Sequence, residues 1–102
     1  MNTFFAATAS VVFSVITLSG TAQSENQSFA NPKVGSQRLD LCLDWGRDCG
    51  KPAADAYCQM LGHARADHIQ IRKDVGKTAI ISSKAICSDP TCDGFRYIEC
   101  AD

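Results

Sequence analysis

Apolar and polar residues are distributed differently in three successive parts of the chain. Residues 4–18 are apolar except for threonine and serine. Residues 23–37 are polar and contain asparagine, serine, proline and glycine without any apolar period. From residue 38 onward, apolar residues recur at the spacings of strands and of a helix. This division predicts a targeting segment, a flexible leader and one folded domain.

The first part has the features of a secretory signal peptide. The apolar run at residues 4–18 is shorter than the roughly 20 residues that span a bilayer. Small residues follow it at Gly20 to Ala22, as a signal peptidase requires. We therefore predict a signal peptide at residues 1–22, a flexible leader at residues 23–37 and a cysteine-rich domain at residues 38–102. The mature protein would be secreted or periplasmic.

Five segments of the predicted domain have the pattern of a strand or a helix. Alternation of apolar and polar residues indicates two of the strands, and β-branched or aromatic residues indicate two more. A segment rich in proline, glycine and aspartate precedes the last strand and is predicted to be a loop. The expected elements are a strand at 38–45, a helix between Pro52 and Gly62, and strands at 68–74, 78–87 and 95–100.

The predicted helix has a signal at each end and one apolar stripe. Pro52 suits the first turn, where its missing N–H would have had no partner, and Gly62 suits the left-handed position past the end. Cys58 lies on the stripe and is therefore expected to face the core. The stripe follows the spacing i, i+3, i+4 and i+7 and consists of Ala54, Tyr57, Cys58 and Leu61.

The order of these elements predicts an α+β fold in which one short helix packs on a small antiparallel sheet. About 80 residues remain after the signal peptide, and a domain of that size usually needs disulfides or a bound metal ion to stabilise its small core. The chain contains six cysteines, at positions 42, 49, 58, 87, 92 and 100. In an exported chain we expect them to form disulfides.

The pairing of the cysteines is only partly constrained by sequence, because six cysteines allow fifteen connectivities. Cys58 is predicted to lie on the buried face of the helix, so its best partner is Cys100 at the end of the last strand. The remaining four can pair locally across a turn and a loop. We favour Cys58 with Cys100, Cys87 with Cys92 and Cys42 with Cys49; the alternative has Cys49 or Cys42 reaching Cys92 or Cys87.

Charge and motif content exclude several classes of function. Ten basic and eleven acidic residues give a net charge of -1, so no basic surface for nucleic acid or anionic lipid is expected. We therefore expect no nucleic-acid partner, and no membrane partner after removal of the signal. The cysteine spacings do not fit structural zinc, and no C-x-x-C redox motif occurs. We expect no metal and no cofactor.

No catalytic constellation is evident either, so we do not expect an enzyme. Asp40, Asp44 and Asp48 recur every fourth residue but lack the pattern of a calcium loop, and we expect solvated carboxylates. His63 and His68 could act as general bases. No G-x-S-x-G motif or free cysteine supplies a nucleophile for them, so we expect exposed polar histidines.

Two segments resemble parts of known extracellular families. The segment from Trp45 to Ala66, with its Trp-Gly pair and the sequence AYCQMLG, resembles the helical portion of scavenger receptor cysteine-rich domains. The segment CSDPTCDGFRYIEC at residues 87–100 resembles the end of rhamnose-binding domains of the sea-urchin-egg-lectin type. Residues 38–100 as a whole are similar to small secreted six-cysteine proteins without an assigned activity. These resemblances imply an extracellular binding module for a protein, a polyanion or a sugar.

The candidate ligand contacts are aromatic and polar residues. Sugar sites combine an aromatic face with a few fixed polar groups, and protein sites favour Trp, Tyr and Arg. Because the domain is small, we expect its large aromatics Trp45, Tyr57 and Phe95 in the core, which leaves Tyr97 and Arg96 the most accessible. The candidate ligand-binding residues are Tyr97, Arg96, Asp93 and Trp45.

The sequence thus favours a secreted, non-enzymatic module that recognises a glycan or an extracellular protein. Its contact face would be formed by the Cys87–Cys92 loop and the last strand. The alternative is a small secreted inhibitor or effector that binds a target protein through an exposed loop. The loops at Asp74 to Thr78 and Ser88 to Gly94 are the candidates for that role.

Overall fold

The computed structural model describes residues 26–102. The predicted signal peptide at residues 1–22 and the first residues of the predicted leader lie outside the described part. The elements in chain order are β1 (Gln27–Ala30), β2 (Lys33–Val34), β3 (Gln37–Leu39), β4 (Cys42–Asp44), β5 (Arg47–Cys49), α1 (Lys51–Met60), β6 (Arg65–Arg72), β7 (Thr78–Ala79), β8 (Ile86–Cys87) and β9 (Gly94–Ala101).

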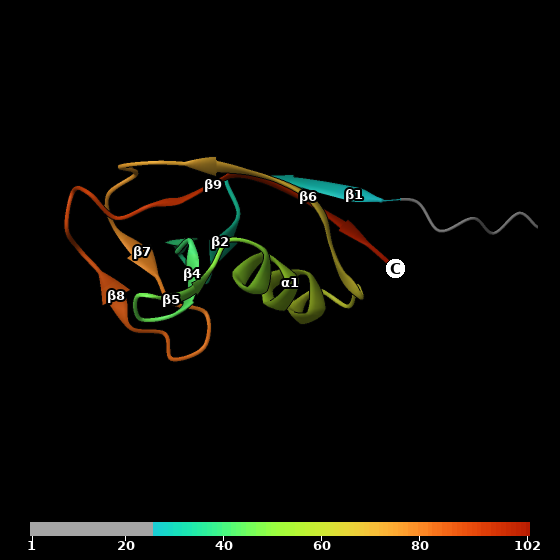
Figure 1. Cartoon of the computed structure of the whole chain (residues 1–102), viewed down its shortest axis with the longest axis horizontal. Helices are drawn as coiled ribbons and strands as arrows, with labels where there is room; N and C mark the ends of the chain where they lie inside the picture. Colours follow the sequence, from blue (N-terminus) through green and yellow to red (C-terminus); the bar gives the residue numbers. More distant parts are fainter. Residues whose placement is uncertain (1–25) are drawn as a thin grey trace, which may run out of the picture.

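One layer of the fold is a three-stranded antiparallel sheet in the order β1-β9-β6 (Figure 1). The long strand β9 lies in the middle, with Ile98 opposite Phe29 on one side and Ile69 on the other. The expectation of a flexible leader at residues 23–37 is therefore wrong, because Gln37 begins β3, residues 33–34 form β2 and residues 27–30 form β1. These residues are short of apolar period because β1 is an edge strand, and only Phe29 packs against the core.

A second sheet, in the order β2-β3-β7-β8, adjoins the first at one end of the molecule. Its β3–β7 pair is parallel, whereas the β2–β3 and β7–β8 pairs are antiparallel. The single strand expected at 78–87 is instead a hairpin of β7 and β8. Its turn is closed by hydrogen bonds from Ile80 N–H to the Ala85 carbonyl and from Lys84 N–H to the Ile80 carbonyl.

The strand expected at 38–45 is also divided in two. It breaks at Asp40, whose carboxylate accepts a hydrogen bond from the Cys42 N–H at 3.0 Å and turns the chain. Strand β3 before the break joins the second sheet, and β4 after it pairs with β5 in a separate hairpin. Asp40 is 6 % exposed, so the expectation that it is solvated is wrong. A local alternation cannot reveal such a break because both halves keep the same period.

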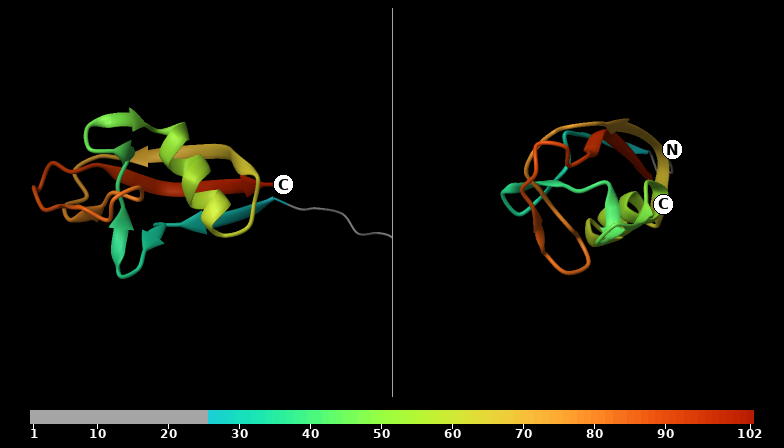
Figure 2. Two further views of the ribbon diagram at one scale, coloured as in Figure 1. Left: turned by 90° about the horizontal axis from the view of Figure 1, so that it is seen from below. Right: turned by 60° about the vertical axis from the view of Figure 1, so that its left-hand side comes forward.

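Helix α1 packs across the three-stranded sheet, as the view from below shows (Figure 2). It begins after Gly50, with Pro52 in its first turn, and its last helical residue is Met60. Gly62, two residues later, has a φ of +94°. The His63 N–H donates to the Cys58 carbonyl at 2.9 Å and the Gly62 N–H to the Gln59 carbonyl at 3.0 Å. These two bonds form a Schellman motif, so the glycine stop predicted from sequence is confirmed.

The buried stripe of the helix differs from the predicted one at its last position. Ala54, Tyr57 and Cys58 are buried as expected, and Ala53 is buried with them. Leu61 is 43 % exposed, because the helical residues end at Met60 and the helical period no longer applies. The stripe is therefore confined to the middle of the helix.

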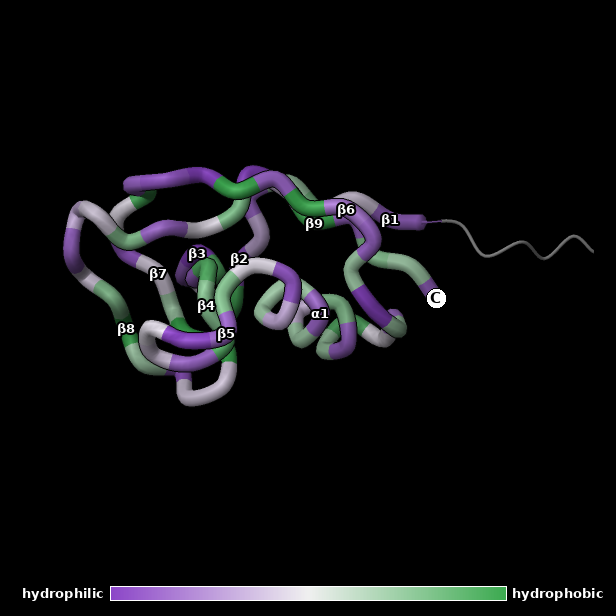
Figure 3. The backbone as a smooth tube through the Cα atoms, viewed as in Figure 1, coloured by the Kyte–Doolittle hydropathy of each residue, from purple (hydrophilic) through white to green (hydrophobic). Residues whose placement is uncertain are grey.

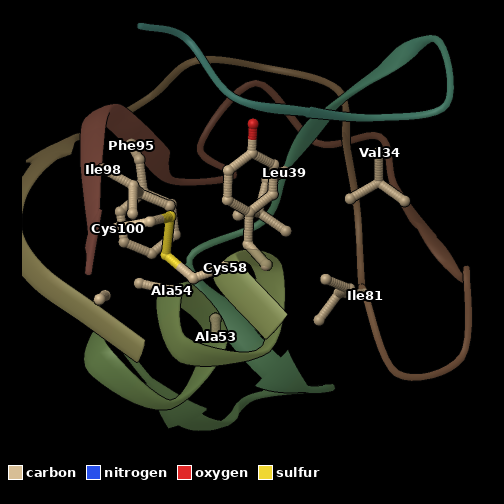
Figure 4. Packing of buried hydrophobic residues seen from close by; sticks show 11 residues of the cluster. Val34, Leu39, Ala53, Ala54, Cys58, Ile81, Phe95, Ile98 and Cys100 are labelled. Atoms are coloured by element: carbon tan, nitrogen blue, oxygen red, sulfur yellow. A yellow bond between two sulfur atoms is a disulfide. The ribbon is translucent and has the colours of Figure 1, made fainter. Parts of the chain in front are cut away.

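The core lies between α1 and β9 (Figure 4). Figure 4 shows the Cys58–Cys100 disulfide joining the helix to the strand, close to Phe95 and Ile98. Phe95 is 1 % exposed and Tyr57 is 6 % exposed, which confirms their predicted burial. Trp45 is 63 % exposed, so its predicted burial is wrong.

Strand β6 combines apolar and polar residues along its length (Figure 3). The sequence places Ile69 and Ile71 on one face, but only Ile69 packs against the core, while Ile71 is 47 % exposed. The pairing with β9 is irregular between Gln70 and Ile71. A change of register in a strand alters which side the following residues face, so the alternation does not carry through.

The α+β fold predicted from sequence is confirmed for residues 26–102, which contain one helix, mainly antiparallel strands and three disulfides. The disulfides join Cys42 to Cys49, Cys58 to Cys100 and Cys87 to Cys92, which is the favoured pairing. Three disulfides fit an extracellular protein. No helix within residues 26–102 is long and apolar enough to cross a membrane.

Candidate functional site

A pocket of about 260 Å³ lies between the β4–β5 hairpin and the loop that precedes β9. Its lining is mostly apolar, with carboxylates as the only charged groups. The residues that line it are Asp40, Leu41, Cys42, Trp45, Gly46, Ile80, Cys87, Cys92 and Asp93. Two of the three disulfides contribute to the walls, which fixes both sides of the pocket covalently.

The β4–β5 hairpin holds Trp45 at this pocket. Cys42 and Cys49 are opposite each other in the hairpin, and their disulfide closes it. Gly46 follows Trp45 in the turn with a φ of +71°, a conformation that glycine adopts without strain. The Asp44 carboxylate accepts a hydrogen bond from the Ser82 hydroxyl at 2.8 Å, which ties the hairpin to the β7–β8 turn. The exposed indole is therefore carried by a constrained turn.

The opposite wall is the loop at residues 87–93, which is also constrained. The Cys87–Cys92 disulfide closes it, and the Asp89 carboxylate accepts hydrogen bonds from the backbone N–H and the hydroxyl of Thr91. These two bonds lower the pKa of Asp89 below its ordinary value. The Leu41 N–H donates to the Asp93 carbonyl at 2.9 Å, so the loop is joined to the start of the hairpin.

The two carboxylates of the pocket differ in their surroundings. Asp40 is buried, and its two oxygens accept hydrogen bonds from the Thr78 hydroxyl and the Cys42 N–H. Asp93 is half-buried, and its Oδ1 accepts from the Asp74 N–H at 2.9 Å. Within the described residues, no hydrogen bond engages Asp93 Oδ2. Asp40 therefore connects β7 to the start of the β4–β5 hairpin, whereas Asp93 uses only one of its two oxygens.

The structure divides the four predicted ligand contacts into two groups. Trp45 and Asp93, which are 48 positions apart in sequence, both line the pocket. Arg96 and Tyr97 lie further along β9 and do not line it. Tyr97 is half-buried between Ala30 and Gln70 of the neighbouring strands, and Arg96 is exposed at the irregularity of the sheet.

The predicted histidines have separate structural surroundings. His63 Nδ1 lies 3.0 Å from Asp102 Oδ1 and its Nε2 lies 3.0 Å from Gln27 Oε1. Its side chain is only 15 % exposed, so the prediction of an exposed histidine is wrong for His63. His68 is exposed as expected, with its Nε2 at 3.8 Å from Glu99. Neither histidine lines the pocket.

Two further groups with shifted pKa values belong to the helix and its contacts. Burial raises the pKa of Tyr57 above 10.0. Partial burial also acts to raise the pKa of Asp55, but hydrogen bonds from Lys51 Nζ and from the Ala66 N–H outweigh it and hold that pKa below 3.8. Asp55 thereby joins α1 to β6. In residues 26–102, no group of three or more His, Cys, Asp or Glu side chains is placed to hold a metal ion.

Sequence reasoning missed most of the pocket because its lining comes from distant segments. Leu41 and Ile80 were expected in strands, without any indication that they meet beside Trp45. A usable signal was the pair Trp45-Gly46 between two cysteines that are seven positions apart. A glycine turn inside so short a disulfide loop favours an exposed aromatic over a buried one, because the tip of a short hairpin has little core to reach.

Comparisons with known proteins add no relative to this description. No family model matches the chain, and no curated protein or solved structure matches it.

Proposed function

We propose that the protein is a secreted or periplasmic, non-enzymatic binding module that holds a glycan at the pocket beside Trp45. The observation that carries the proposal is the 63 % exposure of Trp45 at the edge of an apolar pocket. A large aromatic side chain costs free energy when it is left in water, and burial of such a side chain typically contributes about 1.5–3 kcal/mol. Ligand pockets are typically lined by apolar and aromatic side chains, and Trp45 lies at such a pocket.

The chemistry of the pocket suits a sugar. Carbohydrate ligands present apolar C–H faces and hydroxyl donors, and sites for such ligands combine an aromatic surface with a few polar groups. Trp45 supplies the aromatic surface, and Asp93 Oδ2 supplies a free acceptor. The resemblance of residues 87–100 to the end of rhamnose-binding domains supports the same class of ligand.

The rigidity of the walls also supports a binding role. A site that is ordered before the ligand arrives loses less conformational entropy on binding. Both walls of this pocket are closed by short disulfide loops, and hydrogen bonds connect the hairpin to Ser82 and Leu41 to Asp93. No catalytic role is needed to account for the arrangement.

The proposal is tested with oxidised protein, produced from the full chain by a secreting host, on a glycan array. We expect saturable binding to at least one glycan, and loss of that binding in Trp45→Ala. Because Trp45 is mostly exposed, this substitution should change the free energy of unfolding by no more than about 0.5 kcal/mol. Unchanged far-ultraviolet circular dichroism and an unchanged unfolding midpoint would show that the fold is intact.

The matched control is Arg96→Ala, which removes an exposed residue outside the pocket. Binding should survive this change. If Arg96→Ala abolishes binding while Trp45→Ala does not, the ligand lies on β9 and the pocket proposal is wrong. If no glycan binds and a protein from the secreted fraction is captured in a Trp45-dependent manner, the module is a protein-binding inhibitor or effector.

A further inference from the structure

The charge of the pocket restricts its ligand. Nine residues line it, and the only ionisable side chains among them are those of Asp40 and Asp93. No lysine, arginine or histidine is part of the lining. The nearest cation in sequence on the hairpin is Arg47, whose largely exposed guanidinium lies 4.0 Å from the Asp44 carboxylate and does not line the pocket. An anionic ligand would meet two carboxylates without a compensating positive charge.

Trp45 strengthens this preference for positive charge. An indole face attracts a cation through its quadrupole, and Trp is the best of the aromatic side chains in this respect. Trp45 and Asp93 line the same pocket, so one cationic group could contact the indole and the carboxylate together. A charge-assisted hydrogen bond to a carboxylate is about twice as strong as a neutral one.

We infer, on the basis of the proposed function, that the ligand is a saccharide with a protonated amino group, held between Trp45 and Asp93 Oδ2. The sugar ring lies against the apolar walls, and the ammonium group donates to Asp93. Asp40 takes no direct part, because its oxygens already accept hydrogen bonds from Thr78 and Cys42. The site thereby selects free amino sugars over their N-acetylated or acidic counterparts.

The test compares two probes that differ only in this group, the hexamer of glucosamine and the hexamer of N-acetylglucosamine. Binding is measured by isothermal titration calorimetry at low salt and about pH 6, where aspartate side chains are normally ionised. We expect the glucosamine hexamer to bind roughly tenfold more tightly, as one cation–π contact and one charge-assisted hydrogen bond would give. Added salt should weaken this preference, because the pocket is open to solvent.

Two variants separate the role of Asp93 from general electrostatics. Asp93→Asn should reduce the preference between the two hexamers, because only the cation–π contact with Trp45 then favours the ammonium group. Asp67→Asn removes the same charge from an exposed residue outside the pocket, and it should keep the preference. Asp93→Asn retains the oxygen that accepts from the Asp74 N–H, so the loop should remain folded.

Several results would overturn the inference, and they differ from those that overturn the proposed function. Equal affinity for the two hexamers, or a preference that is undiminished in Asp93→Asn, would refute the role of the amino group. Failure of both hexamers to bind would also refute it, while Trp45-dependent binding on the glycan array would leave the proposed function standing. Tighter binding of a lysine-rich peptide than of the glucosamine hexamer would show that the ligand is a basic protein segment and not a saccharide.

Discussion

The Cys58–Cys100 disulfide is predicted to be the most important of the three for stability. It closes a loop with a sequence separation of 42, whereas the other two close loops with separations of 7 and 5. In the chain-entropy treatment, the long loop contributes about 4 kcal/mol and the short loops about 2.4 and 2 kcal/mol. A chain of this size has a total stability of roughly 4–12 kcal/mol. Loss of this disulfide alone should therefore remove at least about a third of the total stability.

Two double variants are compared, Cys58→Ala/Cys100→Ala and Cys42→Ala/Cys49→Ala. Alanine is preferred to serine because both Cys58 and Cys100 are fully buried and a hydroxyl there would lack an assured partner. Urea unfolding is followed by far-ultraviolet circular dichroism under non-reducing conditions. The indole of Trp45 is a poor probe, since it is already 63 % exposed in the folded protein.

We expect the Cys58/Cys100 variant to lose about 4 kcal/mol and the Cys42/Cys49 variant about 2.4 kcal/mol. The denaturant dependence should also be steeper in the first variant, because its unfolded chain is less constrained and exposes more surface. Lower stability of the Cys42/Cys49 variant than of the Cys58/Cys100 variant would contradict the expected effect of loop length. An unchanged unfolding midpoint in the Cys58/Cys100 variant would contradict the stabilising role of this disulfide.

Three further substitutions test particular contacts of the fold. Asp55→Ala should cost about 1–2 kcal/mol at neutral pH, because it removes the hydrogen bonds to α1 and β6. The folded-state pKa of Asp55 is lowered, so its contribution is complete above the unfolded value of 3.8 and is lost as the pH falls through the folded value. Gly94→Ala should cost about 2–3 kcal/mol, because an added Cβ would lie 2.9 Å from the Leu39 carbonyl oxygen. Thr78→Val should cost about 1–3 kcal/mol, since it leaves the buried Asp40 short of a donor.

Urea unfolding of matched controls decides each of these predictions. For Asp55, the difference from the parent must disappear in acid, and a difference that is constant with pH would contradict the assignment. In Gly35→Ala, the added Cβ meets no atom within 4 Å, so only the φ of +64° should cost stability, by about 1 kcal/mol. An equal loss in Gly94→Ala would mean that the strands move apart to accommodate the added Cβ. Ser82→Ala removes an exposed hydrogen bond from the Ser82 hydroxyl to Asp44, and it should lower the free energy of unfolding by less than about 0.5 kcal/mol. If Ser82→Ala lowers stability as much as Thr78→Val, the burial of the Thr78–Asp40 hydrogen bond does not determine its contribution.

Local signals in the sequence were sufficient for several parts of the fold. The helix was predictable because Pro52 and Gly62 act on the backbone beside them and require no distant contact. Strand β9 was predictable from its β-branched and aromatic residues. The favoured disulfide pairing followed from the expected burial of Cys58 and from two short cysteine spacings.

The tertiary structure decided the features that depend on non-local contacts. Residues 27–30 form a strand because they pair with the edge of β9. Strand β3 pairs with β7, and not with the partner of β4, because the chain turns at Asp40. The predicted burial of Trp45 failed for the same reason, since composition gives the number of aromatics that a small core needs but not which of them reach it.

The candidate site shows the same division. The cysteine count and the hydrophobic periodicity were enough to predict a six-cysteine α+β domain, and Trp45 and Asp93 were among the candidate ligand contacts. Only the tertiary structure brought these two residues to one pocket and left Arg96 and Tyr97 outside it. The physical reason is that a pocket is formed by segments that pack together in space, whereas hydrophobic period, turn residues and caps report only on neighbours along the chain.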